Sequence, residues 1–188
     1  MKALDRLRGR SGRLWAIQRL ARLEPDQLEA LVALARVVGR EHVGPRRHGG
    51  ISASASISPL ASLRFAERLE IGAKAAIGPY CAVWGGFEAW TRIGPGALLG
   101  PGVVVVAGNH VVDGPGWVRE LGFDEHDATV GEGAWIGANT TIVGCSVGEG
   151  AVVAANSVVI EDVPAGAIAA GAPARVVRMR RADTSVAT

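Results

Sequence analysis

The chain has 188 residues and a mass of 19.4 kDa, which fits one domain with an appendage and excludes a large two-domain enzyme. Hydrophobic residues make up 48% of it and aromatic residues only 5%, so we expect a narrow core of Val, Ile, Leu and Ala. The net charge is +2, and two cysteines are too few for a disulfide scaffold. No apolar stretch approaches the roughly 20 residues of a membrane span, and no signal segment is recognised, so we expect a cytoplasmic protein.

Residues 1–47 are expected to form a helical N-terminal segment, because apolar residues recur there at helical spacing. One helix is predicted before Pro25, and a second between Pro25 and Gly39, residue types that are typical of a helix start and stop. The first helix is basic and amphipathic, with arginines at Arg6, Arg8, Arg10, Arg13, Arg19 and Arg22. We interpret these arginines as the solvated face of a packed helix, with docking on a membrane surface or a lipid-linked acceptor as the alternative.

From Ile51 onward the sequence follows a period of six. A helix repeats its apolar face about every 3.6 residues and a strand every second residue, so a period of six predicts short strands that each end in a bend. Three such units close a triangular coil, and stacked coils pair as parallel strands around a column of aliphatic side chains. The aliphatic residues form five groups of three: Ile51, Ile57 and Leu63; Ile71, Ile77 and Val83; Ile93, Leu99 and Val105; Val130, Ile136 and Ile142; Val147, Val153 and Val159.

The spacing departs from six only between one group and the next. The four departures run from Leu63 to Ile71, from Val83 to Ile93, from Val105 to Val130, and from Ile142 to Val147. Chance would scatter such departures over all three corners of the coils. One corner is therefore predicted to carry every insertion. The predicted fold is an all-β parallel β-helix of about five triangular coils over residues 48–178, after a short N-terminal α-helical segment and before a tail at 179–188.

The longest insertion, residues 106–129, is the first place to look for chemistry, because long loops on repeat scaffolds commonly carry binding sites. His110 lies five residues after Val105, so the preceding coil is expected to hold its backbone in place. A histidine in that position can act as a general base. Asp113, Asp124, Glu125 or a backbone carbonyl could orient its imidazole, whereas His126 is interpreted as a surface residue of the loop.

Four segments resemble the hexapeptide-repeat acyltransferases, in the branch of xenobiotic and sugar O-acetyltransferases. They are Asn109-His110, residues 130–138 (VGEGAWIGA), residues 153–159 (VAANSVV) and residues 171–178 (GAPARVVR). The resemblance implies a left-handed β-helix, a homotrimer, and acyl-CoA bound in a cleft between neighbouring subunits. It also implies that His110 is the catalytic base, with Asn109 beside it.

The resemblance extends to the co-substrate. Ala138 and Ala155 match the positions at which the family contacts the pantetheine arm, and Trp135 is expected to flank that arm. Arg175 and Arg178 match its phosphate-contacting residues, as suits the pairing of guanidinium with phosphate. For the two alanines the alternative is ordinary bend packing, and the arginine cluster that includes Arg180 and Arg181 could also be a solvated tail. Candidate acceptor-binding residues are Tyr80, Trp84 and Trp117.

The predicted function is transfer of an acetyl group from acetyl-CoA to a hydroxyl of a sugar, a polysaccharide unit or a sugar-bearing antibiotic. The alternatives are an N-acetyltransferase for an amino sugar and a non-catalytic β-helical scaffold. No metal is expected, because a zinc-dependent hydratase of this fold would need about three His ligands and only His110 and His126 lie in the coil region. The basic residues do not alternate with aromatic ones, so nucleic acid is not an expected partner.

Overall fold

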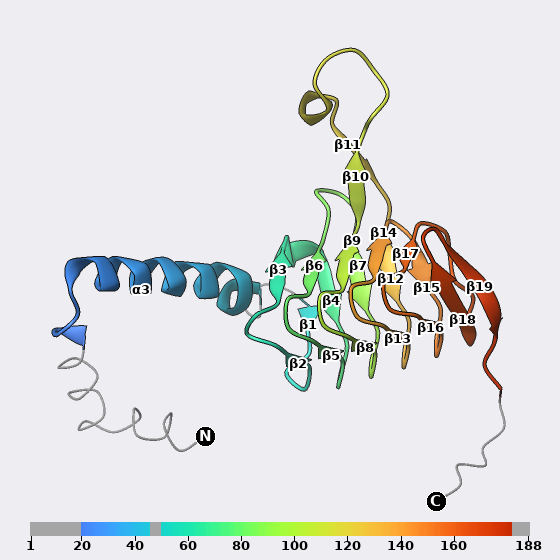
Figure 1. Ribbon diagram of the computed structural model, residues 1–188, viewed down its shortest axis with the longest axis horizontal. Coiled ribbons are helices and arrows are strands. Elements are labelled where there is room, and N and C mark those ends of the chain that lie inside the picture. The colour runs from blue at the N-terminus through green and yellow to red at the C-terminus, as the bar shows by residue number, and fades with distance from the viewer. Residues whose placement is uncertain (1–19, 46–49, 182–188) are drawn as a thin grey trace, which may run out of the picture. The chain divides into compact units, whose positions relative to one another are not determined.

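The computed structural model describes residues 20–45 and 50–181 (Figure 1). The chain divides into two compact units, Met1–Arg40 and Glu41–Thr188. The first predicted helix, with its arginines from Arg6 to Arg19, lies outside the described residues, as does most of the predicted tail. Within the described residues, no helix has the length and the apolar character of a membrane span.

The N-terminal unit contains the second predicted helix, α3 (Pro25–Val38), and confirms its position. Glu24 precedes the helix, and its backbone N–H donates to Gln27 Oε1 at 3.1 Å, one half of a capping box that satisfies a free backbone donor at the helix start. At Gly39 the backbone keeps right-handed helical angles, and a π-helical turn, η1 (Gly39–Val43), follows. No residue of α3 is buried.

The coil unit has three walls, each a sheet of parallel strands (Figure 1). The first wall consists of β1 (Gly50–Ile51), β4 (Leu69–Ile71), β7 (Thr91–Ile93), β12 (Ala128–Val130) and β15 (Ser146–Val147). The second consists of β2 (Ser56–Ile57), β5 (Ala76–Ile77), β8 (Leu98–Leu99), β13 (Trp135–Ile136) and β16 (Val152–Val153), extended by β18 (Ala167–Gly171) and the antiparallel β19 (Ala174–Met179). The third consists of β3 (Ser62–Arg64), β6 (Ala82–Trp84), β9 (Val104–Val106), β14 (Thr141–Val143) and β17 (Val158–Val159).

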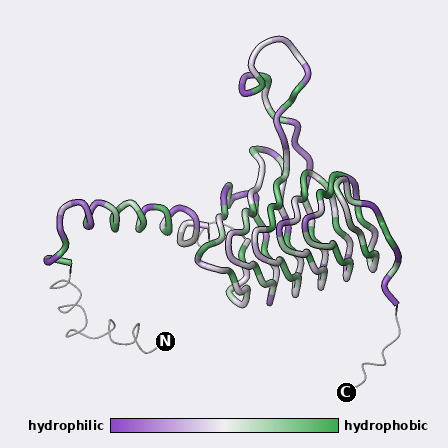
Figure 2. Tube along the Cα trace, in the orientation of Figure 1, coloured by the Kyte–Doolittle hydropathy of each residue, from purple (hydrophilic) through white to green (hydrophobic). Residues whose placement is uncertain are grey.

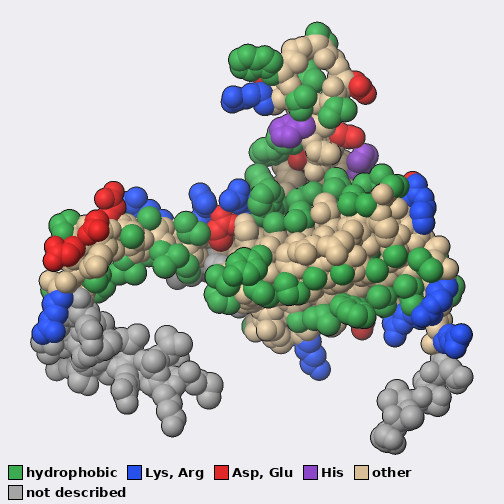
Figure 3. Space-filling view, in the orientation of Figure 1, with side chains coloured by type: hydrophobic (Ala, Val, Ile, Leu, Met, Phe, Trp, Pro, Cys, Tyr) green, Lys and Arg blue, Asp and Glu red, His purple; other side chains and the backbone are tan. Residues whose placement is uncertain are grey.

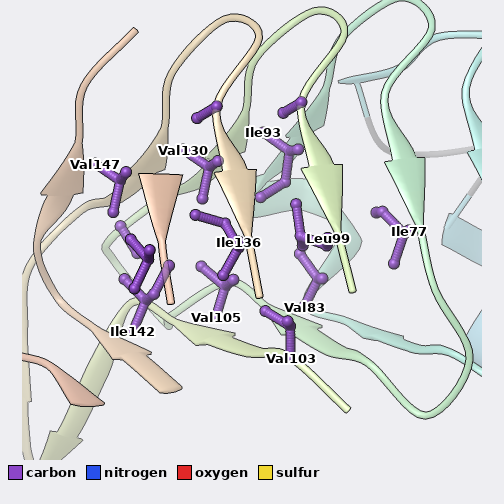
Figure 4. Close-up of a cluster of buried hydrophobic side chains, with 14 of the residues drawn as sticks. Ile77, Val83, Ile93, Leu99, Val103, Val105, Val130, Ile136, Ile142 and Val147 are labelled. Atoms are coloured by element: carbon purple, nitrogen blue, oxygen red, sulfur yellow. The ribbon is translucent and has the colours of Figure 1, made fainter. Parts of the chain in front are cut away.

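The strand register confirms the period of six. In the first wall Ile51, Ile71, Ile93, Val130 and Val147 are successive register partners, and the aliphatic residues of the other two walls align in the same way. All of these side chains are buried apart from the first two, Ile51 and Ile57, which are partly buried against the core (Figure 4). Figure 2 shows hydrophobic segments that recur along the coils.

Every insertion leaves the column at the third corner, between the third wall and the next strand of the first wall, as predicted. A short 3-10 helix, η2 (Ala66–Arg68), occupies the first of these connections. Residues 107–127 form an arm instead of an irregular loop, because β10 (Gly108–His110) pairs antiparallel with β11 (Phe123–Glu125), and η3 (Val118–Glu120) lies between them (Figure 1).

The other two corners stack backbone on backbone. A Cβ placed on Gly131 would lie 2.6 Å from the backbone nitrogen of Glu149 in the next coil, and one on Gly94 would lie 2.6 Å from the backbone nitrogen of Glu132. At Gly133, two residues further along the bend, the space around a Cβ would be open, but φ is +61°. Glycine adopts this left-handed conformation more readily than other residues.

We expect Gly131→Ala to destabilise the protein more than Gly133→Ala. The first substitution forces a methyl group against rigid backbone and should lower the free energy of unfolding by about 3 kcal/mol, whereas the second only puts alanine into a left-handed conformation, which costs about 1 kcal/mol. Urea denaturation followed by circular dichroism at one protein concentration measures both values. Equal losses for the two variants would contradict the tight stacking at this corner.

Candidate active site

The base of the arm positions His110. Ala107 is buried, and its carbonyl accepts the N–H of His126 at 2.8 Å, so both strands of the arm start from a fixed point on the column. His110 and Phe123 are register partners across the two strands, and their rings stack with centroids 4.5 Å apart. Asn109 Oδ1 accepts the backbone N–H of His110 at 2.9 Å. The imidazole is therefore held by the arm and remains exposed to solvent.

A pocket of about 350 Å³ lies at the third corner, and His110 is one of the residues that line it. It draws its side chains from the ends of the third-wall strands and from the insertions of successive coils, and Figure 3 shows hydrophobic side chains beside a histidine at the base of the arm. The side chains that line it are Arg64, Phe65, Trp84, Phe87, Val106, Ala107, Asn109, His110, Phe123 and Glu125. Aromatic side chains thus dominate a site whose polar side chains are those of Arg64, Asn109, His110 and Glu125.

Four of these rings form a row along the insertions. The Phe65 and Phe87 centroids are 5.2 Å apart, those of Phe87 and Phe123 are 4.9 Å apart, and the row ends in the stacked pair of Phe123 and His110. Such distances are within the range of favourable edge and offset ring contacts. The row gives the pocket an apolar side that leads to the imidazole.

Glu125 ties the arm to the preceding coil. Its carboxylate accepts the backbone N–H groups of Phe87 at 2.8 Å, Glu88 at 2.7 Å and Ala89 at 3.1 Å. Burial alone would raise the pKa of Glu125, but these three hydrogen bonds and the charge of Arg68 hold that pKa below its ordinary value. The oxygens of this carboxylate are therefore engaged in holding the backbone at residues 87–89.

Two other carboxylates near the arm have partners other than His110. Asp124 pairs with His126 at 3.2 Å between Oδ1 and Nε2. Asp127 accepts the backbone N–H of Trp90 at 2.8 Å and pairs with Arg92, and these two contacts lower its pKa. Asp113 is exposed on the arm. In the part of the chain that the structure describes, no side chain hydrogen-bonds the imidazole nitrogens of His110.

The predicted co-substrate residues lie together elsewhere on the column. Trp135 is 52% exposed on the outer face of the second wall, with Leu98 and Val152 as its register partners. Ala138 and Ala155 stand at the adjoining second corner, where the backbone N–H of Asn156 bonds to the carbonyl of Ala138. These residues and the strand β19 form one continuous region, which we call the second-wall strip: Leu98, Trp135, Ala138, Val152, Ala155, Arg175 and Arg178.

The two arginines of this strip are exposed on β19. Arg175 pairs with Glu161 at 3.1 Å, and Arg178 donates to the carbonyl of Met179 at 3.1 Å. Each keeps its guanidinium at the surface, where a phosphate could reach it.

Of the three predicted acceptor-binding residues, only Trp84 lines the pocket. Tyr80 is 72% exposed at the second corner, in a left-handed conformation with φ at +62°, and Trp117 is 70% exposed on the arm beside η3. The structure therefore brings Trp84, Asn109 and His110 together and leaves Tyr80 and Trp117 outside. Sequence reasoning missed Arg64, Phe65 and Phe87, because nothing in the repeat marks the side chains that end a coil.

Neither cysteine takes part in a site. Cys81 and Cys145 are buried in the core, and burial raises the pKa of both thiols, that of Cys145 to about 11. Across the described ranges, no group of three or more His, Cys, Asp or Glu side chains is placed to hold a metal ion.

Solved structures share this fold. A hexapeptide-repeat acetyltransferase from Vibrio cholerae O1, in complex with acetyl-CoA, is 25% identical, covers 84% of this chain and 91% of its own, and has a TM-score of 0.67. A maltose O-acetyltransferase from Clostridium difficile 630 is 22% identical over 81% of this chain and 86% of its own, with a TM-score of 0.65. AntD, an N-acyltransferase from Bacillus cereus in complex with dTDP and 3-hydroxybutyryl-CoA, is 20% identical over 72% and 86%, with a TM-score of 0.59. No protein-family model and no curated protein matches the sequence.

We expect Glu125→Gln to lower stability at neutral pH and to have less effect in acid. The depressed pKa means that the carboxylate contributes stability fully above its ordinary value of about 4.5, and that this contribution is lost as the pH falls through the lower folded-state value. For a partly exposed charged acceptor we expect a loss of about 1 kcal/mol at pH 7.

Thermal denaturation at pH 7 and at pH 3 measures this difference. Asp124→Asn is the matched control, since Asp124 is a neighbouring carboxylate of the same strand that makes no backbone contact with residues 87–89. A difference between Glu125→Gln and the unmodified protein that stays constant with pH would show that the charge of Glu125 plays no part.

Proposed function

We propose that this protein, which has the repeat and the fold of the hexapeptide-repeat acetyltransferases, transfers an acetyl group from acetyl-CoA to a hydroxyl of a sugar, a polysaccharide unit or a sugar-bearing antibiotic. The observation that carries the proposal is the exposed imidazole of His110, which the arm holds at the end of an aromatic pocket. A non-catalytic scaffold would have no use for a histidine held in this way.

In the proposed reaction His110 acts as the general base. A sugar hydroxyl is protonated at neutral pH, so neutral imidazole takes its proton as the oxygen attacks the thioester carbonyl. The tetrahedral intermediate, whose oxyanion needs nearby N–H donors, then expels the CoA thiolate, which takes the proton back from the imidazolium. The acetyl ester, CoA–SH and neutral His110 result, and no metal is required.

The second-wall strip is the proposed binding surface for acetyl-CoA. Trp135, Ala138 and Ala155 would lie along the pantetheine arm, and Arg175 and Arg178 would contact phosphate groups. Within one chain the strip lies along the second wall and second corner, and His110 lies at the third corner. The proposal therefore includes a homotrimer of left-handed coils, in which the strip of one copy faces the pocket of the next.

The same proposal assigns residues 48–178 to the acyltransferase domain and residues 1–47 to a helical N-terminal segment. It also assumes a cytoplasmic location, where CoA thioesters are available.

An amino sugar is the second candidate acceptor. AntD, which shares the fold, is named as an N-acyltransferase and has been solved with dTDP. An ammonium group must also lose a proton before it attacks, so the same base would serve both reactions.

The direct test is release of free thiol from acetyl-CoA against a panel of sugars, aryl glycosides such as p-nitrophenyl β-D-galactoside, amino sugars and antibiotics. Amines that outperform the corresponding hydroxyl compounds would favour the second candidate. If no acceptor releases thiol and calorimetry detects no acetyl-CoA binding, the protein is a scaffold.

We expect His110→Ala to lower kcat by about 10²- to 10⁴-fold, the usual contribution of a general base. Acetyl-CoA affinity, measured by calorimetry, should not change. His126→Ala is the control, because this second histidine of the arm pairs with Asp124 and lies outside the pocket lining. Unchanged turnover in His110→Ala would place the base elsewhere.

We expect Arg178→Ala to raise the KM for acetyl-CoA about tenfold, as the loss of one charge-assisted contact predicts, without lowering kcat. Steady-state kinetics with varied acetyl-CoA measure both constants. Arg36→Ala in α3 makes the same change of charge in the N-terminal unit and should leave both constants unchanged. An unaltered KM in Arg178→Ala would remove β19 from the binding surface.

A further inference from the structure

We propose that Glu41 is a positioning residue for the acceptor: it holds Arg64 directly and Trp84 through Ser62, and so fixes these two side chains as one side of the pocket. The inference rests on the proposed function, since it takes the occupant of the pocket to be the acceptor. It gives Glu41, which precedes the first coil in the sequence, a part in substrate recognition.

Glu41 stands out by its burial. Its residue is 4% exposed, and no other charged side chain is buried among those that the structure describes. It belongs to the same compact unit as the coils. Removing a carboxylate from water is unfavourable unless charged and hydrogen-bonding partners replace the water. Here the Ser62 hydroxyl donates to Oε2, and Arg64 Nε donates to Oε1 at 3.2 Å.

The contacts continue from Glu41 to Trp84. The indole N–H of Trp84 donates to Ser62 Oγ at 3.0 Å, so this hydroxyl donates to Glu41 and accepts from Trp84. The guanidinium of Arg64 lies over the Trp84 ring, 4.6 Å from its centroid. The carboxylate of Glu41 thus orients the Trp84 indole at two places. Ser62 links it to the edge of the ring, and Arg64 links it to the face of the ring.

Arg64 and Trp84 line the pocket together with His110, whereas Glu41 and Ser62 do not. Glu41 therefore acts on the pocket only through the side chains that it holds. A planar indole and a planar guanidinium that are already fixed lose little conformational freedom when a ligand binds. Without the carboxylate both side chains would be free to turn, and the same ligand would bind more weakly.

The lining indicates the class of acceptor. Phe65, Trp84, Phe87 and Phe123 offer ring faces, and the carboxylate of Glu125 is already bound to three backbone N–H groups. The other polar side chains of the lining are Arg64, Asn109 and His110. The pocket therefore suits an acceptor with an apolar ring face beside its hydroxyl, such as an aryl glycoside, more than a free sugar.

The test follows the indole N–H resonance of Trp84, assigned by its loss in Trp84→Phe. In the unmodified protein, p-nitrophenyl β-D-galactoside should shift this resonance as it binds. Glu41→Gln and Ser62→Ala should each move the resonance before any ligand is added. Each should also raise the dissociation constant of the probe about fivefold to tenfold, the effect of losing one charge-assisted contact. Ser62→Ala keeps the test decisive if Glu41→Gln does not fold.

Glu70→Gln is the matched control. Glu70 also pairs with an arginine, at 3.3 Å from Arg92, but this pair lies on the first wall outside the pocket. This variant should leave the resonance and the dissociation constant unchanged.

Kinetics separate positioning from catalysis. In Glu41→Gln the KM for p-nitrophenyl β-D-galactoside should rise by the same factor, with the KM for acetyl-CoA and the pH dependence of kcat unchanged. A dissociation constant that neither Glu41→Gln nor Ser62→Ala alters would overturn the inference, and so would a probe that leaves the Trp84 resonance unmoved. If the unmodified protein binds the probe in a Glu41-dependent way but releases no thiol from acetyl-CoA, the proposed function is wrong, whereas the positioning role of Glu41 is supported.

Discussion

The close stacking of one coil on the next is the constraint on which the rest of this structure depends. At the first corner, Gly72, Gly94, Gly131 and Gly148 each leave room for backbone of the following coil, and any Cβ there would come within 2.6 Å of it. At the second corner, a Cβ on Gly78, Gly100 or Gly137 would come within 3.0 Å of the backbone of the following coil. An insertion at either corner would separate the coils and break two walls of parallel pairing. The third corner has no such glycine stack, so the chain can leave and re-enter the column only there.

This constraint explains which parts of the fold could be predicted from the sequence. The contacts that build the column repeat with every coil, so Ile71, Ile93 and Val130 occupy equivalent places in the sequence and in space. Their burial, the three walls and the corner that takes the insertions all follow from the spacing. The helix α3 could be predicted for a similar reason, since its start and stop depend on neighbours within one turn.

The contacts between insertions could not be predicted, because they do not repeat. Glu125 holds Phe87 from 38 residues away, and Glu41 reaches Arg64 from 23 residues away. Neither spacing belongs to a period, and a carboxylate in a polar segment is most simply interpreted as solvated. The antiparallel pairing of β10 with β11 was missed for the same reason. The position of His110 beside the pocket could be predicted because His110 lies only a few residues after β9, at the end of β10. Of the carboxylates expected to orient its imidazole, Asp124 and Glu125 are engaged elsewhere and Asp113 is exposed.

The result is a division between two kinds of surface. The second-wall strip is part of the column, and its residues are set by the same stacking that sets the core, so a substitution there that alters a bend also alters the coils. The pocket at the third corner is built from side chains of the insertions and of the strand ends, and several of these contact one another. Its shape can therefore change by substitution at Phe65, Trp84 or Phe87 without disturbing the coils. A protein built in this way can keep the proposed acetyl-CoA surface while its pocket changes.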